Sequence, residues 1–478
     1  MENDGDWIAD ANSAVTISLV ASSEAGLQAI ESFSPAYTYP IFGDAQEIFG
    51  YKDLKISLQY HARDMRPCVS VTYGKKFKAI GETKPTDIEG TLKGFLPSVA
   101  FQKSAEFKTM ISQRSDNWKP PGDLVGSVNN KDQTYEVWRS SLTSPIAKQL
   151  LQRVQILVPF FIEGGSCIEE EELDSRWDIF FFYQNEPGED GEPSYIFAGY
   201  STVYRFFFLL KNESQAASKD PDSLLGADFD PSTLPCRSRI SQFLVLPPFQ
   251  GQGLGPKFYN VIYNTFLNHA PTMEITVEDP NENFDDLRDI ADLRFLREKA
   301  DFTSLKINTD LKFDGKNRKV PADLVDRRAW ETVRRKYKIA PRQFARVVEL
   351  FLMSQLPSTI RAVFPSQCTN AQKPTKEDQH QYRLWKLLVK ERIYRKNKDT
   401  LGQLELHERI AKLEETLSSV EFDYARLLEK DARDDSEPSS NGHGKRKLDD
   451  SEDALTGNDR CLTDSAGDGP SDTPLFQY

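Results

Sequence analysis

The clearest change of hydrophobic periodicity along the chain lies near its centre. Residues 240–246 form an apolar run of strand length, which Pro247-Pro248 ends because proline cannot donate to a sheet ladder. Three glycines at alternate positions follow, and apolar residues then recur at helical spacing from Phe258 to Leu267. Residues 273–277 are again strand-like. This order predicts strand, glycine turn, helix and strand, with the two strands parallel neighbours after a right-handed crossover.

Short apolar runs separated by Gly and Pro fill the first quarter of the chain. Residues 55–60, 69–73 and 94–101 are examples, and the pattern predicts a mixed, strand-rich N-terminal domain. Farther on, residues 145–153 predict a short helix that leads into a strand over residues 154–162.

Two long runs rich in Phe and Tyr, residues 177–183 and 196–210, predict an antiparallel hairpin. Residues 211–237 are polar, with Ser, Asp, Gly and Pro throughout, and predict a long loop.

The chain becomes helical after Arg288. Residues 321–338 and 341–354 are amphipathic and open at prolines, and residues 382–396 form a basic third helix. A seam of period 3.5 follows, made by Leu406, Ile410, Leu413, Leu417, Val420, Tyr424 and Leu427. This seam fits either a helix packed on its own domain or a surface for a partner.

These patterns predict an α+β protein with a mixed central sheet, a strand-rich N-terminal domain and a helical C-terminal domain. The expected divisions are a flexible segment at 1–14, an N-terminal α/β domain at 15–140, a central domain at 141–300, a helical domain at 301–430 and a disordered acidic tail at 431–478. Lys445-Arg446-Lys447 in that tail is a weak candidate for a nuclear import signal.

The amino-acid composition limits the kinds of partner and binding site that we expect. The 478 residues include 73 Asp and Glu against 60 Lys and Arg, so the chain should attract a basic partner and repel bare nucleic acid. Its five cysteines and five histidines are scattered, which predicts neither a disulfide framework nor a metal site. The sequence shows no signal peptide and no apolar stretch of membrane-spanning length, so we expect a soluble intracellular protein without membrane contact.

The glycine turn is the first candidate for chemistry. A P-loop would need Gly before Lys257 and Ser or Thr after it, and a dinucleotide fingerprint would need glycine at Pro256 or Phe258. What remains, Gln250-x-x-Gly253-x-Gly255, resembles the pyrophosphate-binding turn of the Gcn5-related N-acetyltransferase superfamily, which holds acetyl-coenzyme A (acetyl-CoA). A plain turn between strand and helix is the alternative.

The flanking strings are more specific. They resemble the catalytic subunit of type B histone acetyltransferase, which acetylates newly made histone H4, over residues 35–300. The matching strings begin at Tyr39, Ile48, Phe161, Arg176, Gly199, Ser241, Pro247 and Ile275.

The resemblance implies a set of cofactor and catalytic residues. Acetyl-CoA would lie against Phe243, Leu244, Val245, Gln250, Gly251, Gln252, Gly253, Leu254, Gly255, Pro256 and Asn281. A general base is useful because only about one free lysine in a thousand is uncharged at neutral pH. Glu278 is the leading candidate for that base, with Asp279 and Glu163 as others. Alternatively, residues 278–281 are only a turn, with Asp279 or Asn281 capping the next helix.

The resemblance also implies a groove for the histone tail. Its residues would be Asp44, Gln46, Glu47, Trp177, Tyr204, Arg205 and Phe206. Asp44, Gln46 and Glu47 could equally well belong to a surface turn. Tyr204 and Phe206 could instead belong to the core of a strand. Five carboxylates between Glu169 and Asp174 precede Trp177 and add acidic surface.

The expected activity is therefore acetyl transfer from acetyl-CoA to a lysine of non-nucleosomal histone H4, by direct attack in a ternary complex and without metal. Cys167 or Cys236 as an acetyl-accepting nucleophile is less favoured, since no histidine lies near either in sequence. Two rival hypotheses are another amine substrate, such as a small molecule or a protein N-terminus, and a non-enzymatic histone carrier. The resemblance also implies a WD-repeat histone-binding subunit as partner and a location in nucleus and cytoplasm.

Overall fold

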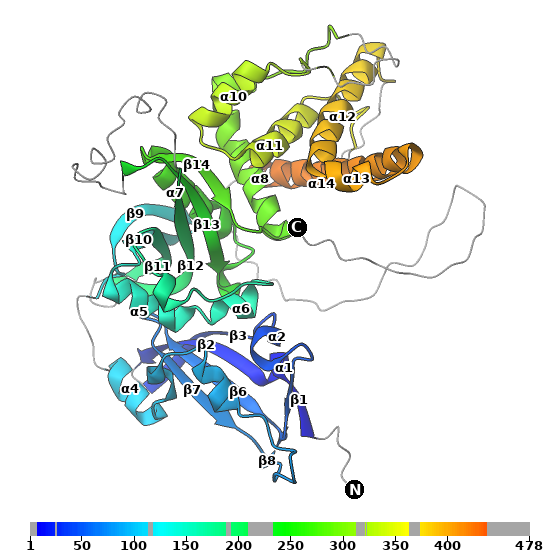
Figure 1. Cartoon of the computed structure of the whole chain (residues 1–478). Helices are drawn as coiled ribbons and strands as arrows, with labels where there is room; N and C mark the ends of the chain where they lie inside the picture. The colour runs from blue at the N-terminus through cyan, green and yellow to red at the C-terminus, as the bar shows by residue number, and fades with distance from the viewer. Residues whose placement is uncertain are drawn as a thin grey trace, which may run out of the picture. The chain divides into compact units, whose positions relative to one another are not determined.

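The chain combines two mixed β-sheets with a helical C-terminal region (Figure 1). The computed structural model describes residues 7–23, 26–112, 118–187, 193–208, 233–311, 321, 323–362 and 373–436. The expected mixture of strands and helices, with helices gathered toward the C-terminus, is confirmed.

The N-terminal part is built on a four-stranded sheet of order β3-β2-β6-β7, in which β2 and β6 are parallel. Two short strand pairs, β1 with β4 and β5 with β8, accompany it. Its elements are β1 (Ile8–Asp10), α1 (Ala11–Ala14), β2 (Val15–Ser23), β3 (Gly26–Phe33), α2 (Tyr39–Phe42), β4 (Glu47–Phe49), β5 (Tyr51–Lys52), β6 (Lys55–His61), β7 (Pro67–Thr72), β8 (Lys75–Lys76), α3 (Ile88–Lys93), η2 (Ser98–Phe101) and α4 (Ser104–Ser112).

Two expectations for this part are wrong in detail. Residues 7–14, expected to be flexible, are ordered: β1 pairs with β4, and the Asp10 carboxylate caps α1 by accepting from Ser13 N–H at 2.8 Å. The apolar run 94–101 contains no strand and ends in the 3₁₀ helix η2, which starts directly after Pro97.

A six-stranded sheet of order β14-β13-β12-β11-β10-β9 forms the centre of the molecule, and Figure 1 shows it strongly curved. The β11–β12 hairpin is antiparallel and β13 and β14 are parallel, which confirms both predictions. The strands are β9 (Asp123–Asn130), β10 (Gln133–Ser141), β11 (Trp177–Pro187), β12 (Pro193–Phe207), β13 (Cys236–Val245) and β14 (Thr272–Val277).

The boundaries of this sheet differ from expectation at two places. Strands β9 and β10 precede residue 141, where the central domain was expected to begin, yet they pair with β11. Strand β13 already begins at Cys236, inside the segment 211–237 expected to be a loop, most of which lies outside the described residues.

The strand expected over residues 154–162 is wrong. This stretch forms the end of α5 (Pro145–Val154) and then α6 (Leu157–Phe161). Its apolar side chains are buried on all sides, so their pattern alone does not distinguish a buried helix from a buried strand. Pro159 also lacks the N–H that a central strand needs.

Helices complete the described chain. They are α7 (Leu254–Asn268), α8 (Glu282–Arg297), α9 (Ala300–Thr303), α10 (Arg327–Lys336), α11 (Pro341–Ser354), α12 (Lys376–Lys396), α13 (Lys398–Gly402) and α14 (Leu406–Ser436). Helix α10 begins later than predicted, because the Asp326 carboxylate caps it by accepting from Arg328 and Ala329 N–H. Just after α10, Lys338 O accepts from Ile275 N–H at 2.7 Å, so this connection covers the outer edge of β14.

The hydrophobic seam of α14 changes character along the helix. Leu417, Tyr424 and Leu427 are buried, whereas Leu406 is 64% and Ile410 53% exposed. The C-terminal half of the seam is therefore internal. The helix also runs to Ser436, so the expectation of disorder from Asp431 onward is wrong for residues 431–436, while residues 437–478, including Lys445–Lys447, lie outside the described residues.

The N-terminal part is joined to α5 through Asp64. Arg153 on α5 donates to Asp64 O at 2.7 Å and lies 3.4 Å from its carboxylate, and Tyr60 O–H donates to Arg153 O. Burial alone would raise the pKa of Asp64, but the hydrogen bond and charge of His61 and the charges of Arg153 and Arg66 lower that pKa to about 2.

We expect Asp64→Asn to lower the free energy of unfolding at pH 7 by about 2 kcal/mol, at roughly 1.4 kcal/mol per pKa unit. Because the folded pKa is depressed from 3.8, this stabilisation is complete above pH 3.8 and is lost as the pH falls through about 2. Urea unfolding between pH 7 and pH 2 measures it, with the exposed Asp132→Asn as control. A difference that stays constant over that range would contradict the linkage.

Candidate functional site

Strand β13 continues beyond the end of its parallel neighbour. Pairing with β14 runs from Cys236 to Ile240, and Glu278 N–H closes it by donating to Ile240 O at 2.8 Å. On the other side, β12 pairs with β13 as far as Val245. Within the described residues, the β14-side edge of residues 241–245 therefore has no strand partner.

A β-bulge lies where this pairing stops. Val203 of β12 faces Ile240 and Thr202 faces Gln242, so Ser241 is the extra residue of β13. Bulges bend a strand and redirect its side chains, and they are frequent next to functional sites. Here the bulge directs the Ser241 hydroxyl toward Glu278.

Glu278 lies directly after β14, beside this bulge. Its Oε2 accepts from the Ser241 hydroxyl at 2.5 Å, and its Oε1 lies 3.5 Å from the Arg239 guanidinium. The side chain is 43% exposed, so a substrate can reach it. Asp279 is also exposed and has a positive φ of 31°, an uncommon conformation for a residue with a side chain.

The third candidate carboxylate, Glu163, lies in an exposed turn after α6. This turn is hydrogen-bonded in two directions. Gly164 N–H donates to the Tyr39 hydroxyl at 2.9 Å, and Ser166 O accepts from Gln242 Nε2 at 2.8 Å. The turn thus connects the N-terminal part with β13 at the bulge.

The glycine turn follows β13 through the short 3₁₀ helix η6 (Pro247–Phe249). Gly251 and Gly253 have φ of 69° and 75°, which glycine adopts without strain. Gly253 is the N-cap of α7 and supplies no side-chain acceptor, so the first N–H groups of this helix point to the turn without a capping side chain. The side-chain amide of Gln250 donates to Val245 O, and that of Gln252 donates to Pro248 O.

Helix α8 lies next to both the turn and the strand edge. A Cβ added at Gly255 would come within 2.8 Å of Leu287 Cδ1, and the Phe284 ring lies 5.0 Å from the Phe243 ring. Asn281 Oδ1 accepts from Phe284 N–H at 2.9 Å, so Asn281, not Asp279, caps the helix. Of the other expected cofactor residues, Leu244, Val245 and Leu254 are buried and Pro256 lies in the first turn of α7.

Aromatic side chains form a row that ends at Glu278. Trp177, Tyr204 and Arg239 are register partners on β11, β12 and β13, and the first two rings are 4.8 Å apart. The Phe206 ring lies 4.5 Å from the Tyr204 ring, and the Arg239 guanidinium stacks over the Phe206 ring at 4.3 Å. We call these four residues the aromatic row. Three of the expected substrate residues are thus brought together beside the leading candidate base.

Arg205 is not part of the aromatic row. Its side chain is 12% exposed, lies 3.6 Å from the Asp178 carboxylate and donates to Ser175 O. Since neighbouring residues on a strand point to opposite faces, Arg205 and the rings of Tyr204 and Phe206 are separated by the sheet.

The expected substrate residues of the N-terminal part differ from one another. Asp44 and Glu47 are exposed, but Gln46 has an internal role, since its Oε1 accepts from Asn12 Nδ2 at 3.0 Å and from Thr38 N–H at 2.9 Å. Conversely, sequence analysis did not identify Arg239 and Ser241. The only signal in the sequence was a cation and a hydroxyl at alternate positions of a predicted strand, and both side chains are partly exposed in the structure.

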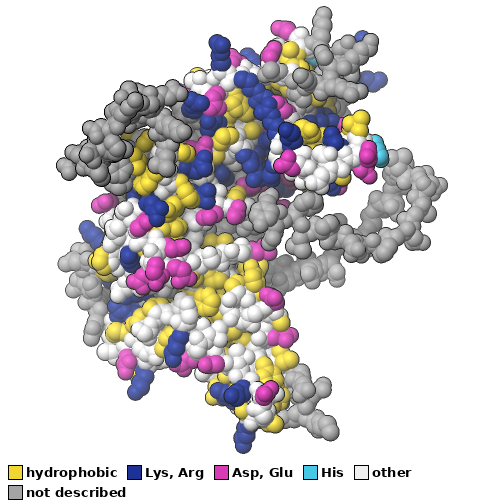
Figure 2. All heavy atoms as spheres, in the orientation of Figure 1, with side chains coloured by type: hydrophobic (Ala, Val, Ile, Leu, Met, Phe, Trp, Pro, Cys, Tyr) yellow, Lys and Arg dark blue, Asp and Glu magenta, His cyan; other side chains and the backbone are white. Residues whose placement is uncertain are grey.

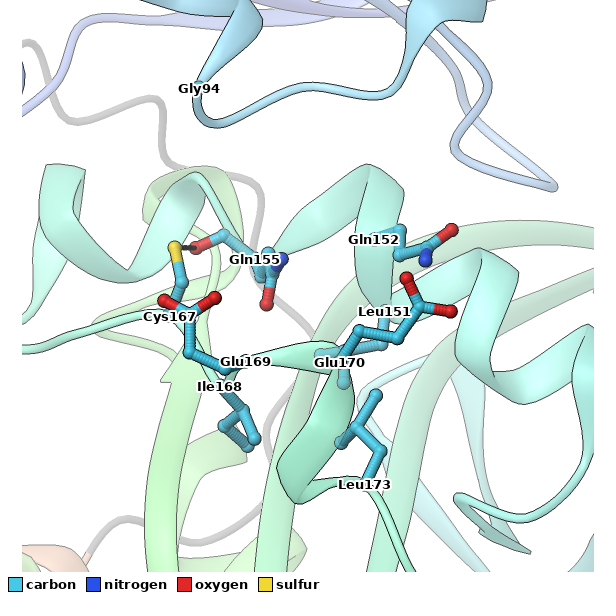
Figure 3. Close-up of a pocket in the computed structure, with 9 residues that line it drawn as sticks. All are labelled: Gly94, Leu151, Gln152, Gln155, Cys167, Ile168, Glu169, Glu170 and Leu173. Atoms are coloured by element: carbon cyan, nitrogen blue, oxygen red, sulfur yellow. Dashed lines mark hydrogen bonds between the residues drawn. The ribbon is translucent and has the colours of Figure 1, made fainter.

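The acidic run borders a cavity of about 210 Å³ (Figure 3). Glu169, Glu170, Glu171 and Glu172 are exposed, and Figure 2 shows acidic side chains gathered near α5. The cavity is lined by Gly94, Leu151, Gln152, Gln155, Cys167, Ile168, Glu169, Glu170 and Leu173.

The cysteines near the site are poor nucleophiles. Burial, and then the charge of Glu169, raise the pKa of Cys167 to about 11, and its Sγ lies 3.6 Å from Gln155 O. Cys236 lies in β13 rather than in a loop, and its burial raises the pKa of its thiol. Since the thiolate is the reactive form, this environment disfavours a thiol-dependent mechanism.

Two further features are absent from the described residues. Within the described ranges, no cluster of His, Cys, Asp and Glu has an arrangement that holds a metal ion. No helix in the same ranges has the length and hydropathy needed to cross a membrane.

Comparisons with known proteins point to one family. Residues 7–163 match the family model described as histone acetyl transferase HAT1 N-terminus, and residues 289–357 match that of fungal HAT1, C-terminal. A histone acetyltransferase type B catalytic subunit of Neurospora crassa is 46% identical over 95% of this chain and 96% of its own length. The subunit of Pyricularia oryzae is 50% identical over 93% of this chain and 96% of its own length. The subunit of Gibberella zeae is 43% identical over 94% of this chain and 96% of its own length.

Proposed function

Since the chain belongs to the histone acetyltransferase type B catalytic subunits, we propose that it acetylates a lysine side chain of newly synthesised, non-nucleosomal histone H4 and so supports histone deposition and chromatin assembly. Histone acetyltransferases use acetyl-CoA, which supplies the acetyl group as a thioester. The observation that carries the proposal is the open edge of β13, with Glu278 at one end and the glycine turn at the other. This arrangement fits the core of the Gcn5-related N-acetyltransferase superfamily.

The residues present fit the chemistry of acetyl-CoA. The pantetheine arm carries amide groups, and the edge at Phe243, Leu244 and Val245, which has no strand partner, offers backbone groups for them, although Val245 O also accepts from the Gln250 side chain. The N–H groups of residues 250–255 and the positive end of the α7 dipole suit the pyrophosphate. Asn281, at the start of α8, borders the same opening.

Glu278 is the proposed general base. Its exposed carboxylate accepts a proton from the incoming lysine ammonium, and the neutral amine nitrogen then attacks the acetyl carbon directly. As the new C–N bond forms, the C–S bond of the thioester breaks, and coenzyme A leaves as a thiolate that takes up the remaining proton of the attacking nitrogen. The hydrogen bond from Ser241 fixes the orientation of Oε2, while Arg239 keeps the carboxylate close to the aromatic row. Glu163 and Asp279 remain proposed as auxiliary carboxylates.

The aromatic row and the acidic run together suit a lysine-rich peptide. The rings of Tyr204 and Phe206 offer apolar and cation–π contacts to an extended basic tail, while the buried Trp177 packs against Tyr204 and supports it. Exposed Asp44 and Glu47 and the run Glu169–Glu172 add negative charge that attracts it from a distance. By family resemblance we also propose a WD-repeat histone-binding subunit as partner and a location in both nucleus and cytoplasm.

The test is mass spectrometry of a histone H4 N-terminal peptide incubated with the protein and acetyl-CoA. We expect a mass increase on a lysine side chain. Acetylation only of the peptide α-amine, or only of small amines in a parallel panel, would replace the proposal by the rival substrate class.

The glycine turn generates one prediction. Gly253→Val should weaken acetyl-CoA binding by about tenfold or more, because a β-branched residue is strained at a φ of 75° and the turn must change shape. Calorimetry measures the affinity. Gly81→Val is the control, since Gly81 also has positive φ and open space but lies in the N-terminal part. Equal affinity in folded Gly253→Val would remove the turn from the cofactor site.

The proposed base generates a second prediction. Glu278→Gln keeps the shape of the side chain but does not accept a proton, so kcat should fall by about 10²- to 10⁴-fold with little change in acetyl-CoA affinity. The rate of the Glu278→Gln variant should continue to rise with pH toward the lysine pKa, because at higher pH the free amine forms without help from a protein base.

Three comparisons interpret that result. Asp279→Asn and Glu163→Gln show whether another carboxylate acts, and Glu298→Gln, an exposed position on the surface, is the matched control. If Glu278→Gln keeps the native kcat and pH profile, Glu278 is only the end of a strand.

The acidic run generates a third prediction. Replacing Glu169, Glu170, Glu171 and Glu172 by Gln should raise KM for the H4 peptide and flatten its dependence on salt, because long-range attraction is screened by ions. KM for acetyl-CoA should stay the same. Neutralising four other exposed glutamates, Glu405 just before α14 and Glu408, Glu414 and Glu415 within it, makes the same change in net charge elsewhere. Equal salt slopes for native and variant protein would assign the run to ordinary solvated surface.

A further inference from the structure

We propose that the C-terminal half of α14 holds α8 in place and thereby positions the acetyl-CoA site, with Arg426 and Asp431 as positioning residues. The inference rests on the proposed function, because it concerns the same opening between β13 and the glycine turn. Nothing in the contact pattern requires α14 to touch the cofactor itself.

Helix α8 forms part of the wall of the opening. Its N-cap Asn281 comes four residues after the end of β14. Phe284 packs on Phe243, whose backbone belongs to the unpaired edge, and Leu287 lies against Gly255 of the glycine turn. A shift of α8 would therefore change both the width of the strand opening and the space at the turn.

Buried polar contacts fix α8 against the sheet and α7. Arg288 is buried, donates to Tyr259 Oη at 3.4 Å and to Ile275 O at 3.3 Å, and lies 3.7 Å from Asp292. Tyr259 in turn donates to Asp292 at 2.9 Å. These contacts hold the inner side of the helix.

Helix α14 holds the same helix from outside, at two points along its length. Arg426 donates to both oxygens of Asp286, at 2.5 and 2.9 Å, a bidentate geometry that fixes direction as well as distance. Asp431 is 4% exposed and accepts from Arg294 at 2.7 Å and from Arg297. Figure 1 shows α14 running past α8 here.

The position of Asp286 explains how this contact reaches the site. Asp286 follows Phe284 by two residues, which places the two side chains nearly opposite each other around the helix. Arg426 on the outer side and Phe243 on the inner side therefore hold α8 between them. Because Arg426 and Asp286 lie 140 positions apart in sequence, the site depends on the last helix that the structure describes.

Three variants of the full-length protein test the inference. Arg426→Gln removes the bidentate pair and Asp431→Asn removes the buried charge while keeping its shape. Glu414→Gln is the matched control, since it breaks an ion pair of α14 with Lys390 on α12 and leaves α8 untouched.

We expect Arg426→Gln and Asp431→Asn to weaken acetyl-CoA binding by about three- to tenfold, the range typical of mutations that act through intervening structure. Values of kcat at saturating acetyl-CoA and of KM for the H4 peptide should stay within about twofold, and Glu414→Gln should match the native protein. The charge reversal Asp286→Arg with Arg426→Asp should restore affinity. Hydrogen exchange should show faster opening of α8 amides in the two single variants.

The outcomes separate the two proposals. If the native protein binds acetyl-CoA with no sensitivity to Gly253→Val, the site itself is wrongly placed. If Gly253→Val weakens binding while folded Arg426→Gln and Asp431→Asn keep native affinity, the site stands and the positioning role is refuted. Should Asp431→Asn fail to fold, the surface pair Arg426–Asp286 and its charge reversal still decide the question.

Discussion

The structure depends on a difference in length between two parallel strands. Strand β14 stops pairing where β13 reaches Ile240, and β13 continues to Val245. An unpaired backbone edge inside a protein is unfavourable, since its N–H and C=O groups need partners. Such an edge is retained where a ligand supplies those partners. The candidate catalytic carboxylate, the bulge and the glycine turn all lie at the limits of this one opening.

Charge and aromatic surface are arranged around the opening in an ordered way. The aromatic row crosses three strands and leads through Arg239 to Glu278, so a peptide lying along it would bring a side chain to the carboxylate. The acidic run lies before Trp177 in the chain, where its exposed charge would act through long-range attraction. In this arrangement the aromatic row would orient a bound peptide at short range, and the acidic run would attract it from a distance.

Sequence analysis predicted the elements that have strong local signals. The Pro247-Pro248 stop, the helix after the glycines and the β11–β12 hairpin follow from proline chemistry and hydrophobic periodicity, and the structure confirms them. The stretch 154–162 was mispredicted because a segment buried on all sides shows no periodicity. Residues 431–436 were mispredicted because their helix is held by distant arginines, which a local window does not contain.

The candidate site also has features that the sequence could predict and features that depend on tertiary contacts. The residue pattern predicted the glycine turn, and the family resemblance proposed Glu278 and the aromatic residues as candidates. The structure shows that Gln46 and Arg205, proposed in the same way, are engaged in internal contacts. Ser241 and Arg239 became visible only when the bulge and the register of the sheet were known. Long-range pairing is the information that a single sequence lacks.

The covered outer edge of β14 has a consequence for how the protein behaves in a crowded cell. Exposed strand edges recruit other strands, including those of unfolded basic proteins. Since Lys338 O accepts from Ile275 N–H on the outer side of β14, an added strand does not find this backbone group free. The connection after α10 therefore protects this end of the sheet from unwanted strand addition.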